Sequence, residues 1–330
     1  MKKVKLGVLG ISTHYGLRMH IPVTKSESVE PWALGSRSLG RAEKAAKKWG
    51  FPRAYGSYQE VLDNSEVEAV YIPLPNDMHA EWIRRCADAG KAVLCEKPIA
   101  LSEKEAAEAL GYAEARGVLA MEAFMYRFHP QWIRAKELID IGEIGKIRAI
   151  QTIFGFNLED QRNIRNQMDR GGGALYDIGC YAISSSRFLL GREPERVISL
   201  VGRDEIGGTD IISSAILDFG DVRTLFTVST RMAARQRVSV FGSGGNLEVI
   251  LPFNPSPDVP IELMVGNRIG TRKIHTKPAD QYGLMLDSFA RAFREGVGAP
   301  TPPADAIANM AALDAVYRSE KSGAWERVGC

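Results

Sequence analysis

The sequence predicts an α/β protein with an N-terminal doubly wound parallel sheet and a C-terminal α/β domain with an open, mainly antiparallel sheet. Three observations lead to this fold class. The chain has 330 residues, more than one ordinary hydrophobic core supports. Its first third alternates short apolar runs with helical patterns, which is typical of βαβ crossovers. Beyond that, period-2 runs separated by short links with Gly or Asp predict strands joined by tight turns.

We assign residues 1–122 to the first domain and residues 123–330 to the second. In the first domain we expect strands at Val4–Leu9, Glu30–Leu34, Val67–Ile72 and Val93–Leu94, and helices at Gly16–Ser26, Leu39–Trp49, Asp77–Ala89 and Glu103–Arg116. In the second we expect a helix at His129–Ile141, strands at 147–156, 196–201, 211–218, 223–230, 237–242, 247–251 and 261–265, and a last helix at about 304–321. Whether that last helix packs back on the first domain stays open.

Composition excludes several classes of protein. The 42 basic and 40 acidic residues leave a net charge of +2, which argues against nucleic acid or a membrane surface as partner. We find no apolar run of membrane-spanning length and no signal peptide. The four cysteines have no C-x-x-C spacing, so we expect a reduced, cytoplasmic protein without a metal site.

The turn after the first strand resembles a dinucleotide fingerprint with altered spacing. Gly10 is in place, Ser12 stands where a second glycine is usual, and Gly16 comes one residue late. A strand, a glycine turn and a helix are the right context for a pyrophosphate at a helix N-terminus. We therefore predict that Gly10, Ser12, Thr13 and His14 bind the cofactor. Alone, the turn is equally compatible with an ordinary strand-to-helix connection.

The turn after the second strand favours NADP(H) over NAD(H). It contains Ser36 and Arg37, with Arg41 shortly after, and no acidic residue at 35–38. In a dinucleotide fold an acid here binds the ribose 2′-hydroxyl, whereas an arginine accommodates a 2′-phosphate. A solvated basic turn is the alternative.

Two further strands end in unusual residues. Pro73, Leu74, Asn76 and His79 follow the third strand, where doubly wound folds bind ligands, although Asn76 can also simply cap the next helix. The fourth strand ends in Glu96-Lys97-Pro98, and packing does not account for a lysine there unless Glu96 pairs with it.

A glycine-rich stretch in the second domain carries the remaining candidates. Gly171-Gly172-Gly173-Ala174-Leu175 precedes Asp177 and Tyr181, which are four residues apart and share one face of a helix. Glycines allow close approach of the backbone to a ligand. A nearby ammonium lowers a tyrosine's pKa and suits it to proton transfer. The alternative is that Tyr181 is a core aromatic.

Together these motifs resemble the glucose–fructose oxidoreductase / inositol dehydrogenase / rhizopine-catabolism family over essentially the whole chain. The resemblance rests on G-x-L-G, the Ser-Arg turn, P-L-P-N-x-x-H, E-K-P and G-G-G-A-L-x-D-x-G-x-Y. The stretch Met121–Gln131 looks most like the NADP-dependent branch that holds D-xylose dehydrogenase, dihydrodiol dehydrogenase and sugar 3-ketoreductases.

The resemblance implies a Rossmann domain that binds NADP(H) and a second domain for substrate and oligomerisation. It implies that Lys97 contacts both the nicotinamide ribose and the reacting oxygen and that Tyr181 is the acid/base. It also implies that Asp177 binds a substrate hydroxyl or helps to relay the proton. Arg165 falls where the family places an arginine near the nicotinamide. Glu96 belongs to the same cofactor site, and no metal is implied.

The expected activity is hydride transfer between the nicotinamide and a ring carbon of a pyranose or related cyclic polyol or keto sugar. Two alternatives stay open: a nucleotide-sugar 3-ketoreductase, and a non-catalytic sugar- or nucleotide-sensing regulator. We expect a homodimer or homotetramer formed through the C-terminal sheet, for which the apolar stretch Ile211–Leu217 is suited. The sequence does not specify the sugar or the direction of reaction.

Overall fold

The computed structural model describes residues 2–329, which form two compact units. The first runs to Met125 and includes Asp280–Ile307, and the second comprises Tyr126–Ala279 and the chain from Ala308 onward. The division thus falls close to the expected boundary at 122, but Asp280–Ile307, which we expected in the second domain, belongs to the first unit.

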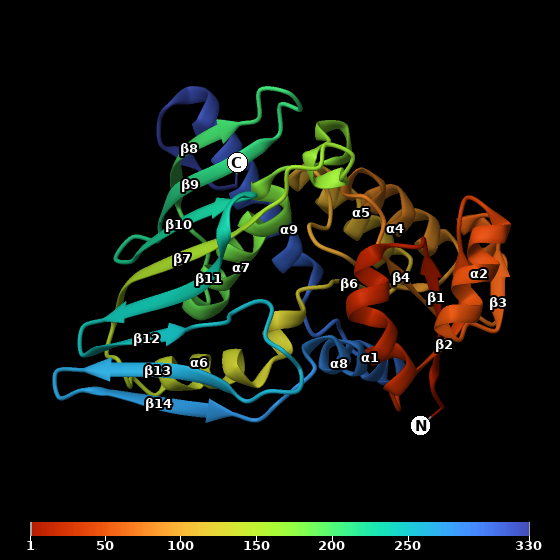
Figure 1. The fold of residues 1–330 in the computed structure, drawn as a ribbon, viewed down its shortest axis with the longest axis horizontal. Helices are drawn as coiled ribbons and strands as arrows, with labels where there is room; N and C mark the ends of the chain where they lie inside the picture. Colours follow the sequence, from red (N-terminus) through yellow and green to blue (C-terminus); the bar gives the residue numbers. More distant parts are fainter. Residues whose placement is uncertain (1, 330) are drawn as a thin grey trace. The chain divides into compact units, whose positions relative to one another are not determined.

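The first unit is built on a parallel sheet with the strand order β3-β2-β1-β4-β5-β6 (Figure 1). The central strands are near-continuous apolar runs and are buried, as a parallel sheet with both faces covered requires. Its strands are β1 (Val4–Leu9), β2 (Val29–Gly35), β3 (Arg53–Tyr55), β4 (Ala69–Ile72), β5 (Ala92–Cys95) and β6 (Ala120–Glu122).

The helices of the first unit include two that sequence analysis did not predict. The helices are α1 (His20–Lys25), α2 (Leu39–Trp49), α3 (Tyr58–Asp63), α4 (His79–Asp88), α5 (Glu103–Ala115) and α8 (Gln281–Glu295). The two not predicted are α3, which begins at a Ser57/Glu60 capping box, and α8. The unit holds α8 in place at Arg294, whose guanidinium donates to both oxygens of the Glu68 carboxylate at 2.8 and 2.7 Å.

The second unit is built on a nine-stranded sheet with the order β14-β13-β12-β11-β7-β10-β9-β8-β15. All neighbours pair antiparallel except β10 and β7, so the expected fold class is confirmed. The strands are β7 (Ile147–Asn157), β8 (Arg196–Arg203), β9 (Asp210–Asp218), β10 (Arg223–Ser229), β11 (Arg231–Gly242), β12 (Gly245–Val249), β13 (Ile261–Asn267), β14 (Thr271–Thr276) and β15 (Glu326–Arg327).

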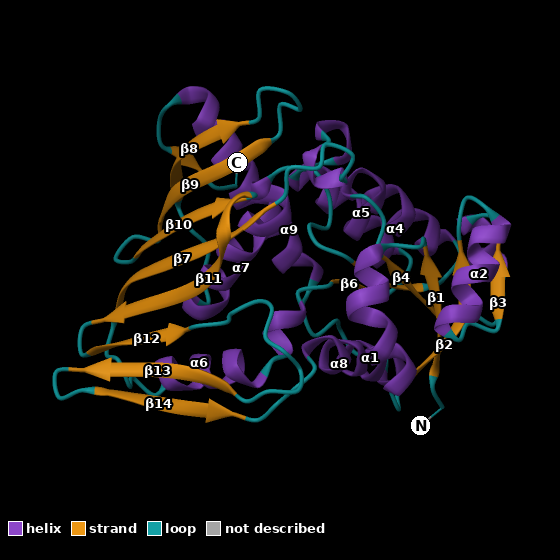
Figure 2. Ribbon diagram, viewed as in Figure 1, coloured by secondary structure: helices purple, strands orange, loops and turns teal. Residues whose placement is uncertain are grey.

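Helices pack on one face of this large sheet: α6 (Pro130–Asp140), α7 (Cys180–Leu190) and α9 (Pro303–Ser322), of which the part from Ala308 belongs to this unit (Figure 2). Ser199 of β8, for example, donates to the Val316 carbonyl of α9 at 2.7 Å. Residues facing the helices, such as Ala215 and Leu217, are buried. On the opposite face Leu200, Ile212, Leu225 and Phe241 are exposed, and register places them across β8, β9, β10 and β11.

No helix among residues 2–329 is long and apolar enough to cross a membrane. Within the same residues, no cluster of three or more His, Cys, Asp or Glu side chains is arranged to hold a metal ion. The cysteines at 86, 95 and 180 are buried, and Cys330 lies outside the described residues.

Candidate active site

The sequence-predicted cofactor residues of the first unit gather at one edge of its sheet. Gly10–His14 follow β1, Ser36–Arg41 follow β2, Pro73–His79 follow β4, and Glu96–Lys97 follow β5. Because the strands are parallel, these segments leave the sheet at the same edge, and the strand order reverses between β1 and β4. This is the position at which open α/β sheets bind ligands.

The helical turn that follows β1 accounts for the irregular spacing of its glycines. Gly10 has φ +103° and its amide donates to the Gly35 carbonyl at 2.9 Å, which ties the turn to the end of β2. Tyr15–Met19 form a π-helical turn before α1. A π-turn holds one residue more than an α-turn and often occurs at functional sites, so it accommodates the residue by which Gly16 is late.

This turn fits a phosphate. The Ser12 hydroxyl accepts a hydrogen bond from the Tyr15 amide at 2.9 Å and so caps the helix. The Ser12 hydroxyl accepts this one hydrogen bond and still has its own O–H to donate to a phosphate oxygen. In the usual fingerprint a glycine backbone amide makes that donation. Thr13 is exposed beside it and His14 is half-buried. Gly16 serves packing, because a Cβ there would lie 3.0 Å from the Trp49 ring.

Tyr58, which sequence analysis did not single out, lies close to the arginines that follow β2. Ser36 is buried, whereas Arg37 and Arg41 are exposed and free to meet a ligand in solvent. Tyr58, at the start of α3, lies close to both arginines: burial raises the pKa of Tyr58, and the two positive charges lower it. Its hydroxyl is 3.7 Å from where a Cβ on Gly10 would stand. Tyr58 thus lies close to both the glycine turn and the arginines. The Ser57/Glu60 capping box was the sequence signal for the helix that begins at Tyr58.

The loop after β4 is held from inside by His79. Nδ1 of His79 lies 2.8 Å from the Pro98 carbonyl oxygen, and Nε2 lies 2.9 Å from that of Leu74. The ring is fully buried, which lowers its pKa. Each ring nitrogen thus faces a backbone carbonyl oxygen, and the neutral imidazole donates to one of the two, so His79 is suited to hold this part of the Leu74 and Pro98 loops in place. Pro73 and Leu74 are buried, and Asn76 is half-buried.

Glu96 and Lys97 differ in their surroundings although they are adjacent. Glu96 is buried, and its Oε1 accepts the Tyr71 hydroxyl at 2.5 Å and lies 3.2 Å from His14 Nε2. Lys97 is half-buried and is joined to Pro98 by a cis peptide bond. The strand end therefore carries a fixed negative charge beneath a partly accessible lysine.

In the second unit, the glycine-rich stretch is fastened to the segment that contains Arg165. The Gly173 amide donates to the Arg165 carbonyl at 2.8 Å, and the Gly172 amide donates to that of Gln167 at 2.9 Å. A Cβ on Gly172 would come within 2.6 to 2.7 Å of three carbonyl oxygens. Only glycine fits there, so the glycines serve a backbone-to-backbone contact.

Asp177 and Tyr181 lie one helical turn apart, as the spacing predicts. Asp177 is inside a second π-helical turn, Leu175–Gly179, and Tyr181 follows in α7. Arg165 donates from Nε to Oδ2 of Asp177 at 2.8 Å. The Tyr181 ring is buried among aromatic rings, with centroids 5.1 Å from Phe253 and 5.9 Å from Phe154. These neighbours fix the ring orientation, whether Tyr181 serves the core or the chemistry.

Asp210 of β9 supports the start of this helix and was not predicted from the sequence. Its Oδ2 accepts the Leu175 amide at 2.7 Å and the Ser213 hydroxyl at 2.9 Å, while Oδ1 accepts the Tyr317 hydroxyl at 3.0 Å. A Cβ on Gly173 would stand 1.9 Å from Oδ1. Position 173 therefore accepts only glycine while Asp210 is in place, because the carboxylate occupies the space that a side chain at 173 would fill.

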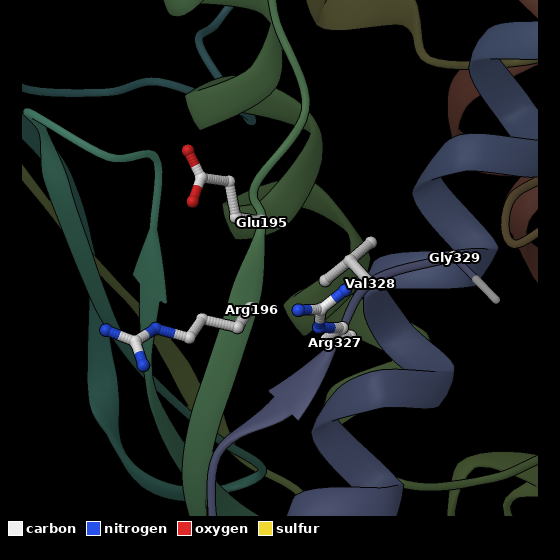
Figure 3. A pocket seen from close by; sticks show the side chains of 5 residues that line it. All are labelled: Glu195, Arg196, Arg327, Val328 and Gly329. Atoms are coloured by element: carbon white, nitrogen blue, oxygen red, sulfur yellow. The ribbon is translucent and has the colours of Figure 1, made fainter.

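A pocket of about 460 Å³ lies away from these residues, at the β8–β15 edge of the second unit. It is lined by Glu195, Arg196, Arg327, Val328 and Gly329 (Figure 3). None of these residues is among those predicted for the site.

The chain matches family models over both units. Residues 4–124 match a model described as an oxidoreductase family with an NAD-binding Rossmann fold, and residues 132–248 match the GFO/IDH/MocA C-terminal domain. An uncharacterized oxidoreductase of Rhizobium meliloti is 39% identical over 99% of this chain and 100% of its own. D-xylose 1-dehydrogenase (NADP(+)) 2 of Haloferax volcanii is 37% identical over 96% of this chain and 98% of its own.

A solved structure is similar throughout. It is the 3-ketoreductase from Actinomadura kijaniata in complex with NADP and TDP-benzene, with a TM-score of 0.92 and 29% identity, covering 96% of this chain and 98% of that one. A doubly wound sheet with a glycine turn after its first strand is the arrangement that binds dinucleotides, and the family models add the oxidoreductase class. The chain belongs to the GFO/IDH/MocA family of oxidoreductases. The family, the enzyme class and the fold expected from the sequence are thereby confirmed, and NADP(H) agrees with the names of two of these relatives.

Proposed function

We propose that the protein transfers a hydride between NADP(H) and a ring carbon of a pyranose or related cyclic polyol or keto sugar. The observation that carries the choice of cofactor is the exposed Arg37 and Arg41 at the end of β2, with no acid at 35–38. Two arginines beside Tyr58 suit a 2′-phosphate and an adenine ring, because guanidinium pairs bidentately with phosphate and stacks on aromatic faces. The names of the relatives support a sugar as substrate.

In this proposal the residues at the β1 edge bind the cofactor. Gly10, Ser12 and Thr13 hold the pyrophosphate at the start of the π-turn, and Ser36, Arg37 and Arg41 hold the 2′-phosphate. Pro73, Leu74 and Asn76 border the nicotinamide half, and we assign Arg165 a role in binding the same half. NADP(H), when bound, accepts or supplies the hydride.

The proton is handled by the protein. The Lys97 ammonium stabilises negative charge that develops on the sugar oxygen, and the Tyr181 hydroxyl gives or takes the proton. Asp177, oriented by its bond from Arg165, accepts a hydrogen bond from a neighbouring sugar hydroxyl. Tyr181 is thus assigned the proton transfer, Lys97 the stabilisation of charge on the oxygen that loses or gains this proton, and Asp177 the orientation of the ring.

A nucleotide-linked keto sugar is the second candidate substrate, favoured by the TDP-benzene in the related ketoreductase. Its diphosphate would need cationic groups in the second unit. Arg165 is paired with Asp177, Arg162 with Asp160, and Arg127 donates to the Ser184 hydroxyl at 2.8 Å. Each of these arginines already has a partner, and we therefore favour a free pyranose.

We also propose a homodimer through the exposed face of the large sheet. Its exposed apolar residues, Leu200, Ile212, Leu225 and Phe241, lie on β8, β9, β10 and β11, with β7 between the last two strands; we call them the apolar band. Arg237 and Glu248 lie on the same face, 3.1 Å apart, so the face carries both signs of charge and no net repulsion. A second copy of the same face is the natural cover for such a band.

A direct assay tests the activity. The purified protein is mixed with NADP⁺ and a panel of aldoses and cyclic polyols, and absorbance is followed in the NADPH band; dTDP-linked keto sugars with NADPH form a second panel. We expect a rise with at least one free pyranose. Turnover only in the second panel would favour the ketoreductase. NADPH binding without turnover in either panel would make the protein a sensing regulator and refute the proposal.

A further inference from the structure

Three elements of the first unit meet at the carboxylate of Glu96. Oε1 of Glu96 accepts the hydroxyl of Tyr71, on β4, at 2.5 Å, and the same oxygen lies 3.2 Å from Nε2 of His14, in the turn after β1. Glu96 itself directly follows β5 and is 8% exposed. The carboxylate is therefore hydrogen-bonded to β4 and lies within ion-pair distance of the histidine in the cofactor turn.

The position of the His14 ring is fixed from a second side. Its edge packs on the ring of Tyr282, with centroids 5.7 Å apart and an interplanar angle of 64°. Tyr282 stands in the first turn of α8, where the Asp280 carboxylate accepts its amide hydrogen at 3.0 Å. A histidine held by an aromatic edge and a carboxylate has little rotamer freedom, so the turn that carries it is anchored.

His14 is available for this contact because of the extra residue in the turn. It stands directly before the π-helical turn Tyr15–Met19, between the Ser12 cap and the first buried residue of the helix, Tyr15. The departure from G-x-G-x-x-G spacing thus has a structural counterpart: a side chain that points to the strand end preceding Lys97.

We propose that His14 is a positioning residue for Lys97: by holding the Glu96 carboxylate, it fixes the strand end that presents the lysine to the reacting oxygen. This inference rests on the proposed function of Lys97. It assigns His14 a different role from the phosphate contact predicted from the sequence. In that role the imidazole acts through Glu96 and does not touch the cofactor.

The charges around Glu96 agree with such a clamp. Burial alone would raise the pKa of Glu96, but His14, Tyr71 and Lys97 outweigh it and hold the pKa at about 2. Tyr282 of α8, His79 of α4 and the buried Cys95 of β5 also interact with the charge of Glu96. Glu96 is therefore ionised at every pH at which the enzyme would be assayed, and removal of His14 would raise its pKa.

The test compares His14→Ala and His14→Gln with the wild-type chain. Glutamine keeps an N–H donor near the position of Nε2 and lacks the ring. For His14→Ala we expect kcat at saturating NADP(H) to fall roughly 10- to 100-fold, the loss that a displaced catalytic group produces, and the acid limb of its pH profile to move to higher pH. NADPH affinity, measured by fluorescence, should stay within about threefold, and His14→Gln should restore most of the rate.

The opposite pattern, a loss of NADPH affinity without a loss of kcat, overturns the proposal. If His14→Ala weakens NADPH binding strongly and leaves kcat at saturation unchanged, His14 is a phosphate contact. His20→Ala serves as the matched control, since His20 is the next histidine along the chain, begins α1 and packs beside the ring of Trp49 of α2. It should leave kcat and the pH profile unchanged.

A double-mutant cycle on stability separates this inference from the proposed function. His14→Ala, Glu96→Gln and the double variant are unfolded by urea at pH 7. If the clamp exists, the double variant loses clearly less stability than the sum of the two single losses. Additive losses refute the clamp whether or not the wild-type enzyme turns over any sugar, whereas a wild-type enzyme without NADP-linked turnover refutes only the proposed function.

Discussion

Arg165 donates from Nε to Oδ2 of Asp177 at 2.8 Å, and its own carbonyl accepts the Gly173 amide at 2.8 Å. The side chain and the backbone of one residue therefore fix both the orientation of the aspartate and the loop that starts its helix. This relation predicts that Arg165 contributes to activity through the geometry of its hydrogen bond to Asp177 as well as through its positive charge.

For Arg165→Ala we expect a loss of roughly 100-fold in kcat/KM for the sugar, because Asp177 is freed to rotate away from the substrate hydroxyl. Arg165→Lys should recover only part of it, since a lysine cannot reproduce the planar donor. Steady-state kinetics measure both. Arg134→Ala, which removes a surface pair with Glu137, is the control, and equal losses in control and variant would contradict this role.

Lys97→Ala and Tyr181→Phe should each abolish turnover while leaving NADPH binding nearly intact. The lysine change removes the ammonium that stabilises the developing charge, and the tyrosine change removes only the hydroxyl group that exchanges the proton. Turnover is followed by NADPH absorbance and binding by fluorescence. Lys104→Ala, at an exposed lysine of α5, should behave as wild type. Full activity in either site variant would refute its assigned role.

Arg37→Ala and Arg41→Ala should weaken NADPH binding roughly 10- to 100-fold each, the range expected when a charge-assisted hydrogen bond is removed. Affinity for NADH should change little, because NADH lacks the 2′-phosphate. Fluorescence titration with both nucleotides gives the ratio directly. If NADPH and NADH are affected to the same extent, the arginines do not read the 2′-phosphate.

Asp210→Asn should destabilise the protein by about 1–3 kcal/mol, because one amide group cannot accept all the hydrogen bonds that end on the carboxylate. Asp221→Asn, at an exposed aspartate, should cost less than about 0.5 kcal/mol. Urea unfolding measures both. A similar loss in the two variants would mean that Asp210 does not support the helix start.

The same residue predicts a pH dependence of stability. Burial raises the pKa of Asp210 even though Leu175, Ser213, Tyr317 and Arg203 lower it. A raised pKa means that the folded protein binds this proton more tightly than the unfolded chain. Its contribution is therefore complete below the unfolded pKa and is lost as pH rises through the folded one. Unfolding measured from pH 4 upward should show this decline, and Asp210→Asn should remove it.

Leu225→Glu and Phe241→Glu should convert a dimer into a monomer, because each places a charge in the apolar band of the exposed sheet face. Light scattering on the eluted protein measures the mass. Ile269→Glu changes an isoleucine that is 97% exposed in the β13–β14 turn, outside the apolar band, and should leave the mass unchanged. A wild-type monomer, or a dimer that survives both substitutions, would contradict the proposed interface.

Patterning alone predicted most of the architecture. Val4–Leu9 and Leu39–Trp49 match β1 and α2 to the residue, because long apolar periodicity and clear end signals define such elements. Short elements such as β3 were missed, since three residues show no period. The helix α8 was missed although Asp280 caps it and its apolar positions recur at helical spacing, so the signal was present.

The site was predictable in its motifs and not in its internal connections. Lys97, Asp177 and Tyr181 stand in distinctive motifs, so sequence reasoning found them. The partners of those motifs come from distant parts of the chain: Asp210 reaches Gly173 from β9, and Tyr58 reaches the glycine turn from α3. Such contacts depend on tertiary packing and leave no local pattern. His79 shows the reverse case, because its motif was visible but its burial between two carbonyls was not.

The most direct test of the central claim is deuterium transfer. The purified protein is given NADP⁺ and a pyranose that turns over, deuterated at every ring carbon, and the NADPH formed is examined by mass spectrometry. The account predicts NADPH that carries deuterium on the nicotinamide, with none formed by Lys97→Ala. NADPH without deuterium, or no NADPH from any sugar of the panel, would contradict hydride transfer from a sugar ring carbon.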